Sequence, residues 1–204
     1  GILQLTDIVD ALELAARTCP GELNPQQISA VGYSGGGGNV MGLCAKFPDL
    51  LHAGAAFFGI SDYELWYRSE GRVDCNRTMD KAIGGGPDQF PERYAARSAL
   101  YAVGNNPWTH LQVFWDSEEK ACPPFLNEWY LAAAKRLGLS NIVARRSQPG
   151  DAARWFHGYR FNHPILAAGD DLFAPEFLAP RPAPVWPEQG ELAVAGYVVT
   201  RHFA

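Results

Sequence analysis

Ser34 lies in the stretch VGYSGGGG (residues 31–38), with Tyr33 before it and four glycines after it. The segment GYSGG matches G-x-S-x-G, the pattern of a serine on a tight turn between a strand and a helix. Such a turn presents the hydroxyl, and the backbone N–H of the next residue, Gly35, can donate to a developing oxyanion. The pattern therefore predicts that Ser34 is a nucleophile that attacks a carbonyl carbon.

The glycines admit a second interpretation, because glycine-rich turns at helix N-termini also bind phosphates. No Gly-Lys-Ser/Thr follows the turn, and no acidic residue ends a strand about 20 positions later, as nucleotide-binding loops require. A strained turn explains Gly32, Gly35 and Gly36, since side chains there would collide with neighbouring backbone. Gly37 and Gly38 are expected to ease the start of the helix.

A serine nucleophile needs a general base, and His157 is the best candidate among five histidines. His52 lies between a helix and a strand, and His110 precedes a strand at the wrong end for the site. His163 stands before a proline, and His202 lies in the tail. His157, in RWFHGYRF, falls in a loop after the last predicted strand of the sheet. The chain order serine, acid, histidine is that of α/β-hydrolases.

The base needs an orienting carboxylate, and the loop after the strand LQVFW offers Asp116, Glu118 and Glu119. This loop is expected at the carboxyl edge of the sheet, where ligands of open α/β sheets bind. Three carboxylates on one loop are ordinarily solvated, so the residues alone leave the identity of the acid open.

The elements that must position these residues alternate along the chain. Amphipathic or small-residue helices are expected over residues 3–19, 39–47 and 125–138. Short apolar runs typical of buried strands cover residues 28–33, 52–60, 110–115 and, more weakly, 141–147. Residues 62–98 are polar and irregular and are expected to form a long excursion with short helices, and residues 163–173 are a candidate last helix. This alternation predicts an α/β domain with a mainly parallel sheet over residues 1–174. Residues 175–204 form a proline-rich linker and a terminal strand.

Composition excludes several classes of protein. The chain has 204 residues, 47% of them hydrophobic, which suffices for one packed domain. A net charge of −5 and scattered basic residues argue against a nucleic-acid partner or a membrane surface. No apolar run is long enough to span a membrane. The four cysteines lie far apart, which excludes an ordinary zinc finger. The protein is expected to be soluble, in the cytoplasm or secreted.

The segment GYSGGGGNVMGLCAKFPDLLHAGAAFFGISDY resembles the catalytic domain of the prolyl oligopeptidase family of serine peptidases. PERYAARSAL, LQVFWDSEEKACPPFLNEWYLAAAKRLG and FHGYRF resemble further segments of that domain, in the same order. The similarity covers roughly residues 1–165. It implies an α/β-hydrolase fold with Ser34 as nucleophile and His157 as general base.

The family's acid loop runs His-Gly-x-x-Asp-x-x-Val-Pro. Aligning Cys122-Pro123 with Val-Pro places Glu119 at the acid, with Asp116 as the fallback. Trp115-Asp116 replaces the family's His-Gly pair, which is a departure. Tyr33 and Trp115 are candidate contacts to substrate.

The family's domain also has several strands before the first helix seen here, and one oxyanion donor comes from that part. The resemblance therefore predicts that a companion polypeptide, or an N-terminal part of the same protein, completes the site and covers the sheet edge.

Three functions are compatible with these residues. The first is a serine hydrolase of prolyl oligopeptidase type, which cleaves peptides through an acyl-enzyme and needs no metal or organic cofactor. The second is an esterase similar to carboxylesterases or dienelactone hydrolases, which would use the same residues on an ester. The third is a hydrolase-derived subunit without catalysis in a larger assembly.

Overall fold

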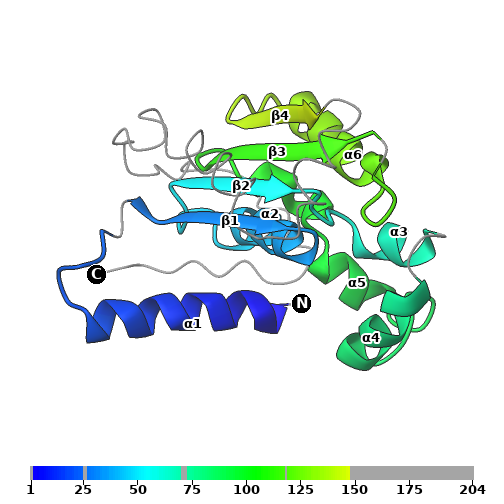
Figure 1. The fold of residues 1–204 in the computed structure, drawn as a ribbon, viewed down its shortest axis with the longest axis horizontal. Coiled ribbons are helices and arrows are strands. Elements are labelled where there is room, and N and C mark those ends of the chain that lie inside the picture. The colour runs from blue at the N-terminus through cyan, green and yellow to red at the C-terminus, as the bar shows by residue number, and fades with distance from the viewer. Residues whose placement is uncertain (1, 25–26, 70–72, 118, 148–204) are drawn as a thin grey trace.

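The computed structural model describes residues 2–24, 27–69, 73–117 and 119–147. Within these ranges four parallel strands form one sheet in the order β1-β2-β3-β4 (Figure 1). Their bounds are Ser29–Tyr33 for β1, Ala53–Phe57 for β2, His110–Asp116 for β3 and Ile142–Ser147 for β4. The strands come in sequence order, so the chain moves across the sheet in one direction. The predicted α/β domain with a parallel sheet is confirmed.

The register of the strands brings their carboxyl ends to one edge of the sheet. Tyr33 at the end of β1 pairs with Phe57 at the end of β2, and Phe57 pairs with Phe114 of β3. Asp116 at the end of β3 pairs with Ser147 at the end of β4. The residues that follow these strands therefore share one edge, which is where open parallel sheets place their sites.

Helices connect the strands and cover the sheet. Their bounds are Ile2–Thr18 for α1, Gly35–Lys46 for α2, Tyr63–Arg68 for α3, Val73–Ile83 for α4, Pro91–Arg97 for α5 and Pro124–Arg136 for α6, with a 3₁₀ helix η2 over Ala99–Asn105. The segment α3–α5 lies beyond the carboxyl ends of the strands, at the right of Figure 1. This is the irregular excursion that residues 62–98 were expected to form.

Two apolar clusters pack on the two faces of the sheet. The first joins α1, α2, η2 and α6 to Ala56 of β2 and Val113 of β3. The second joins α3, α4 and α5 to Phe57 and Phe114. Adjacent residues of a strand point to opposite faces, so β2 and β3 are buried on both sides. That burial explains why their sequences are continuous apolar runs rather than alternating ones.

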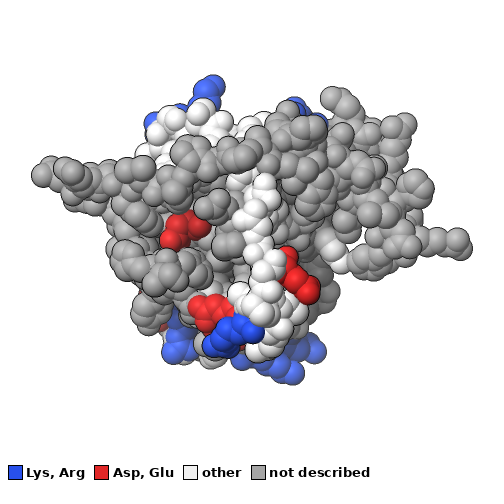
Figure 2. Space-filling model, turned by 90° about the vertical axis from the view of Figure 1, so that its left-hand side faces the viewer, with Lys and Arg blue, Asp and Glu red and all other residues white. Residues whose placement is uncertain are grey.

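The boundary expected near residue 174, the helix expected over residues 163–173 and the strap expected over residues 175–204 all lie outside the described residues. Among the helices of the described ranges, none is both long and apolar enough to cross a membrane. On the face shown in Figure 2, blue and red side chains lie next to each other near the lower edge, so the charges visible there are of mixed sign.

Candidate active site

Ser34 occupies the single residue between β1 and α2, at the carboxyl edge of the sheet. Its backbone is left-handed, with φ 53° and ψ −120°. A non-glycine residue in this region carries conformational strain, which persists only where the surroundings fix it. Two bonds do so: the Ser34 N–H donates to Phe57 O at 2.8 Å, and the Ser34 carbonyl accepts from Gly38 N–H at 3.0 Å. The turn has the strained strand-to-helix geometry that the motif predicts.

The glycines around Ser34 are needed where backbone approaches backbone. A Cβ on Gly32 would lie 2.3 Å from Gly36 O, so β1 and the first turn of α2 can meet only without a side chain there. A Cβ on Gly37 would lie 2.9 Å from both Gly59 Cα and Phe57 O, so α2 touches the end of β2. Gly32 therefore has the role predicted for it.

The prediction for the other four glycines of the turn is wrong. A Cβ on Gly35 or Gly36 would meet nothing within 4 Å, so crowding does not require glycine at either position. Gly37 and Gly38, which were expected only to ease the start of the helix, are instead points of close contact. A Cβ on Gly38 would lie 2.8 Å from the Tyr63 hydroxyl oxygen.

A second strained residue lies beside the serine turn. Phe58, directly after β2, has φ 51° although it is a bulky aromatic residue, and its side chain is buried. Its N–H donates to Phe114 O at 2.8 Å, and the rings of Phe57 and Phe114 stack with centroids 4.2 Å apart. Left-handed bulky residues are genuine outliers. The sequence gives no sign of this one beyond the glycine that follows it.

The first turn of α2 supplies hydrogen-bond donors beside Ser34. Gly35 is the first residue of the helix, and the N–H groups of a first turn have no intrahelical acceptor. The helix dipole adds partial positive charge at the same point. Gly35 thus begins α2 directly after Ser34, and its role as an oxyanion donor stays a prediction.

Glu119 follows β3 and bonds to the backbone of its own loop. Its Oε1 accepts from Ala121 N–H at 2.6 Å and from Cys122 N–H at 3.4 Å. Trp66 of α3 holds the same loop by donating its Nε1–H to Ala121 O at 2.7 Å. Hydrogen bonds from backbone N–H groups hold a carboxylate in one orientation.

The loop after β3 reaches Ser34 through Cys122. The Cys122 Sγ lies 3.5 Å from the Ser34 Oγ, across the end of β2, which separates β1 from β3 in the sheet. The structure thus brings together the serine turn and the predicted acid loop. Sequence reasoning used Cys122 only to align the loop, and it missed both this contact and the bond from Trp66. Neither has a signal in the sequence.

The remaining predicted site residues differ in exposure and in how much of them the structure describes. Tyr33, the last residue of β1, is 40% exposed and can offer its ring to a ligand. Trp115, in β3, is only 8% exposed, so it offers little surface. Asp116 is the last residue of β3, and nothing is described of its side chain. His157 lies outside the described residues. The roles of these four residues, like those of Ser34, Gly35 and Glu119, stay predictions.

Two of the other histidines lie at the opposite edge of the sheet. His110 begins β3 and pairs with Ala53, the residue after His52. The His52 N–H donates to Ile28 O at 2.8 Å, and the His52 carbonyl accepts from His110 N–H at 3.4 Å. Both are therefore at the amino ends of strands, away from Ser34, as the sequence indicated.

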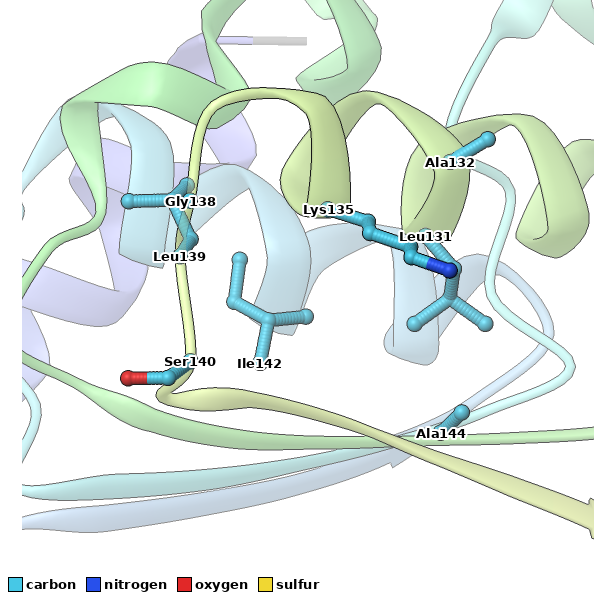
Figure 3. A pocket seen from close by; sticks show the side chains of 8 residues that line it. All are labelled: Leu131, Ala132, Lys135, Gly138, Leu139, Ser140, Ile142 and Ala144. Carbon is cyan, nitrogen blue, oxygen red and sulfur yellow. The ribbon is translucent and has the colours of Figure 1, made fainter.

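The pocket drawn in Figure 3 lies elsewhere, between α6 and β4. It has a volume of about 450 Å³ and is lined mainly by apolar side chains, among them Leu131, Leu139 and Ile142. β4 is at the far side of the described sheet from β1, which carries the serine turn. No predicted site residue lines this pocket, so it is not the place where the predicted chemistry would occur.

The two candidate acids can be separated by replacing carboxylate with amide. Glu119→Gln keeps an oxygen for the Ala121 and Cys122 N–H groups but removes the negative charge. If Glu119 orients the base, kcat should fall by about 10²–10⁴ while the melting temperature stays close to that of the unaltered protein. Asp116→Asn is the matched control and should keep activity. The reverse pattern in steady-state kinetics would assign the acid to Asp116.

Comparisons with known proteins agree with this geometry. The chain is similar to an acylaminoacyl peptidase from Pyrococcus horikoshii, with a TM-score of 0.63 and 22% identity over 81% of this chain. It is also similar to an acylaminoacyl peptidase in complex with Z-Gly-Gly-Phe-chloromethyl ketone, with a TM-score of 0.65 and 23% identity over 92% of this chain. A third similar structure is a puromycin-hydrolyzing peptidase from Mycobacterium tuberculosis, with a TM-score of 0.61 and 18% identity over 70% of this chain.

This chain spans 26%, 28% and 21% of the length of these three structures, respectively. No protein-family model matches the sequence, and no curated protein matches it. The parallel sheet and the strand-to-helix serine turn define an α/β-hydrolase fold. These three solved structures are peptidases, and the resemblance to the prolyl oligopeptidase family is confirmed at the level of fold.

Proposed function

We propose that the protein is a serine hydrolase that cleaves peptide amide bonds through an acyl-enzyme, as peptidases of the prolyl oligopeptidase type do. The observation that supports this most is the left-handed Ser34 between β1 and α2, with φ 53° and ψ −120°. Strained backbone of this kind clusters at active sites, and at Ser34 it coincides with a hydroxyl at the carboxyl edge of the sheet. The loop that carries Glu119 lies against the same serine through Cys122.

In the proposed mechanism, Ser34 Oγ attacks the carbonyl carbon while His157 accepts the hydroxyl proton. The carbonyl oxygen becomes an oxyanion, to which the Gly35 N–H donates. The tetrahedral intermediate collapses: the C–N bond breaks, and the amine leaves with the proton that His157 returns. Water then attacks the acyl-enzyme with His157 again as base, which releases the acid and restores Ser34. Glu119 orients the imidazole throughout.

Acyl transfer of this kind uses a nucleophile, a general base and hydrogen-bond donors, so the proposal requires no metal or organic cofactor. Oxyanion holes usually contain more than one hydrogen-bond donor, and the loss of one of them lowers kcat by about 10²–10³. The Gly35 N–H alone would therefore leave the oxyanion hole incomplete. The expectation that a companion polypeptide or an N-terminal part of the same protein supplies another donor stays a prediction.

The test compares two classes of substrate in the full-length protein. A set of N-blocked peptides with a chromogenic amide tests for a peptidase, and short acyl esters of nitrophenol test for an esterase. We expect the peptide amides to be turned over, and a serine-directed fluorophosphonate to abolish that turnover. Turnover of the esters alone would favour the esterase. Failure to hydrolyse either class or to react with the fluorophosphonate would favour a hydrolase-derived subunit without catalysis.

A further inference from the structure

Cys122 provides a sulfur next to the proposed nucleophile. Its Sγ lies 3.5 Å from Ser34 Oγ, within hydrogen-bonding reach of a sulfur atom, and the residue is a reduced cysteine with only 3% of its surface exposed. Cys122 follows β3 and Ser34 follows β1, so the contact joins two loops that are distant in sequence.

The backbone of Cys122 is held in three ways. Its N–H donates to Glu119 Oε1 at 3.4 Å, and the preceding Ala121 is held by Glu119 and by Trp66 Nε1. Pro123 follows immediately and caps α6, which begins at Pro124, so the chain on that side has fixed φ angles. With the backbone held, only rotation about χ1 can move the sulfur away from Ser34, and the burial of Cys122 limits that rotation.

The surroundings of the sulfur are apolar. Cys122 belongs to the second apolar cluster, together with Phe57, Phe58 and Tyr63. Burial raises the pKa of the Tyr63 hydroxyl, and Cys122 is a further, smaller cause of that rise. Tyr63 is therefore a neutral phenol near the sulfur. In such an environment hydrogen bonds are electrostatically stronger than in water.

We propose that Cys122 is a positioning residue for Ser34, an inference that rests on the proposed function. The Cys122 S–H donates to a lone pair of Ser34 Oγ and keeps the serine side chain in one rotamer. A hydroxyl has one proton and two acceptor lone pairs. With one lone pair engaged by the thiol, the serine proton remains available to the base. The Ser34 Oγ is then already oriented before substrate binds.

Three variants separate hydrogen bonding from packing. Cys122→Ala removes the thiol and leaves space, Cys122→Val fills the space without a donor, and Cys122→Ser keeps a shorter donor. Valine is also the residue with which the family resemblance aligns Cys122, so this variant is compatible with the fold. The net contribution of one hydrogen bond corresponds to a rate factor of about three to ten.

The measurement is the second-order rate of fluorophosphonate labelling of the full-length protein, together with kcat, KM and the melting temperature. We expect Cys122→Ala and Cys122→Val to be labelled about three to ten times more slowly, with kcat reduced in parallel and KM unchanged. Cys122→Ser should recover part of the rate. Valine fills the space that alanine leaves, so the two variants should differ in melting temperature. Equal losses of labelling rate in both variants would then identify the missing S–H donor as the cause.

Two results would overturn the inference and are distinguishable from each other. Labelling of Cys122→Val at the unaltered rate would show that the sulfur only packs against Ser34, and it would leave the proposed hydrolase intact. Absence of labelling in the unaltered protein would count against the hydrolase itself, and the role of Cys122 would be lost with it.

Discussion

Replacing Ser34 with alanine is expected to lower kcat for hydrolysis by at least about 10⁴, with little change in the melting temperature. Removing a serine nucleophile eliminates the acyl-enzyme route, and only the weak catalysis from binding and oxyanion stabilisation remains. The turn should survive the substitution, because the hydrogen bonds that hold it are made by the Ser34 backbone, to Phe57 O and from Gly38 N–H. Alanine is also smaller than serine, so it adds no steric clash. The measurement is steady-state hydrolysis of a peptide amide by the full-length protein.

Ser29→Ala is the matched control for this variant. Ser29 begins β1, the strand that Ser34 follows, and it is exposed at the amino end of the sheet. It should keep full activity. An active Ser34→Ala protein would show that hydrolysis does not proceed through this serine, and a loss shared by both variants would indicate a general effect on β1.

Replacing Gly32 with alanine is the second change with a large expected effect. The added Cβ would lie 2.3 Å from Gly36 O and 2.9 Å from Gly37 N, both of them backbone atoms that no change of rotamer can move. The turn must open, which displaces Ser34 from its strained position. Overpacking of this kind costs about 1–3 kcal/mol in the free energy of unfolding. Loss of alignment at the nucleophile should lower kcat by about 10² or more.

Gly36→Ala tests whether the effect is specific to the contact. A Cβ at Gly36 meets nothing within 4 Å, and alanine is favoured over glycine in a helix. This variant should be as stable as the unaltered protein or more so, as measured by chemical denaturation, and should retain labelling by a fluorophosphonate. Equal stability and activity in Gly32→Ala and Gly36→Ala would contradict the close packing of β1 against α2.

Much of the fold could be predicted from the sequence because it depends on local patterns. The strands β2 and β3 are buried on both faces, and their uninterrupted apolar runs carry that information. The alternation of these runs with helical periodicity then limits the topology to a parallel sheet. The strained turn at Ser34 could be predicted because it imposes glycine at Gly32, a requirement that is visible in the sequence.

The rest of the site depends on how distant segments meet. The contact between Cys122 and Ser34 exists because the loop after β3 crosses the end of β2, and no local pattern encodes that path. The bond from Trp66 to Ala121 joins α3 to the same loop and is equally invisible in the sequence. The glycines illustrate the same limit. The sequence pattern predicted crowding at Gly32, Gly35 and Gly36, whereas the close contacts are at Gly32, Gly37 and Gly38.

Glu119 could be predicted only in part. The resemblance to a family loop selected it as the acid, and its bonds to Ala121 N–H and Cys122 N–H add a structural role that the resemblance did not include. A residue that both shapes the loop and orients a base should respond differently to loss of charge and to loss of the side chain. The amide substitution described above isolates the first of these.

The most direct test of Ser34 as the nucleophile is to locate a covalent adduct. The full-length protein would be treated with a fluorophosphonate, digested, and examined by tandem mass spectrometry across the peptide that contains VGYSGGGG. We expect one phosphonyl group per chain, attached to Ser34 Oγ, and none after denaturation before treatment. An adduct on a different residue, or no adduct on a protein that hydrolyses peptide amides, would contradict the assignment of Ser34.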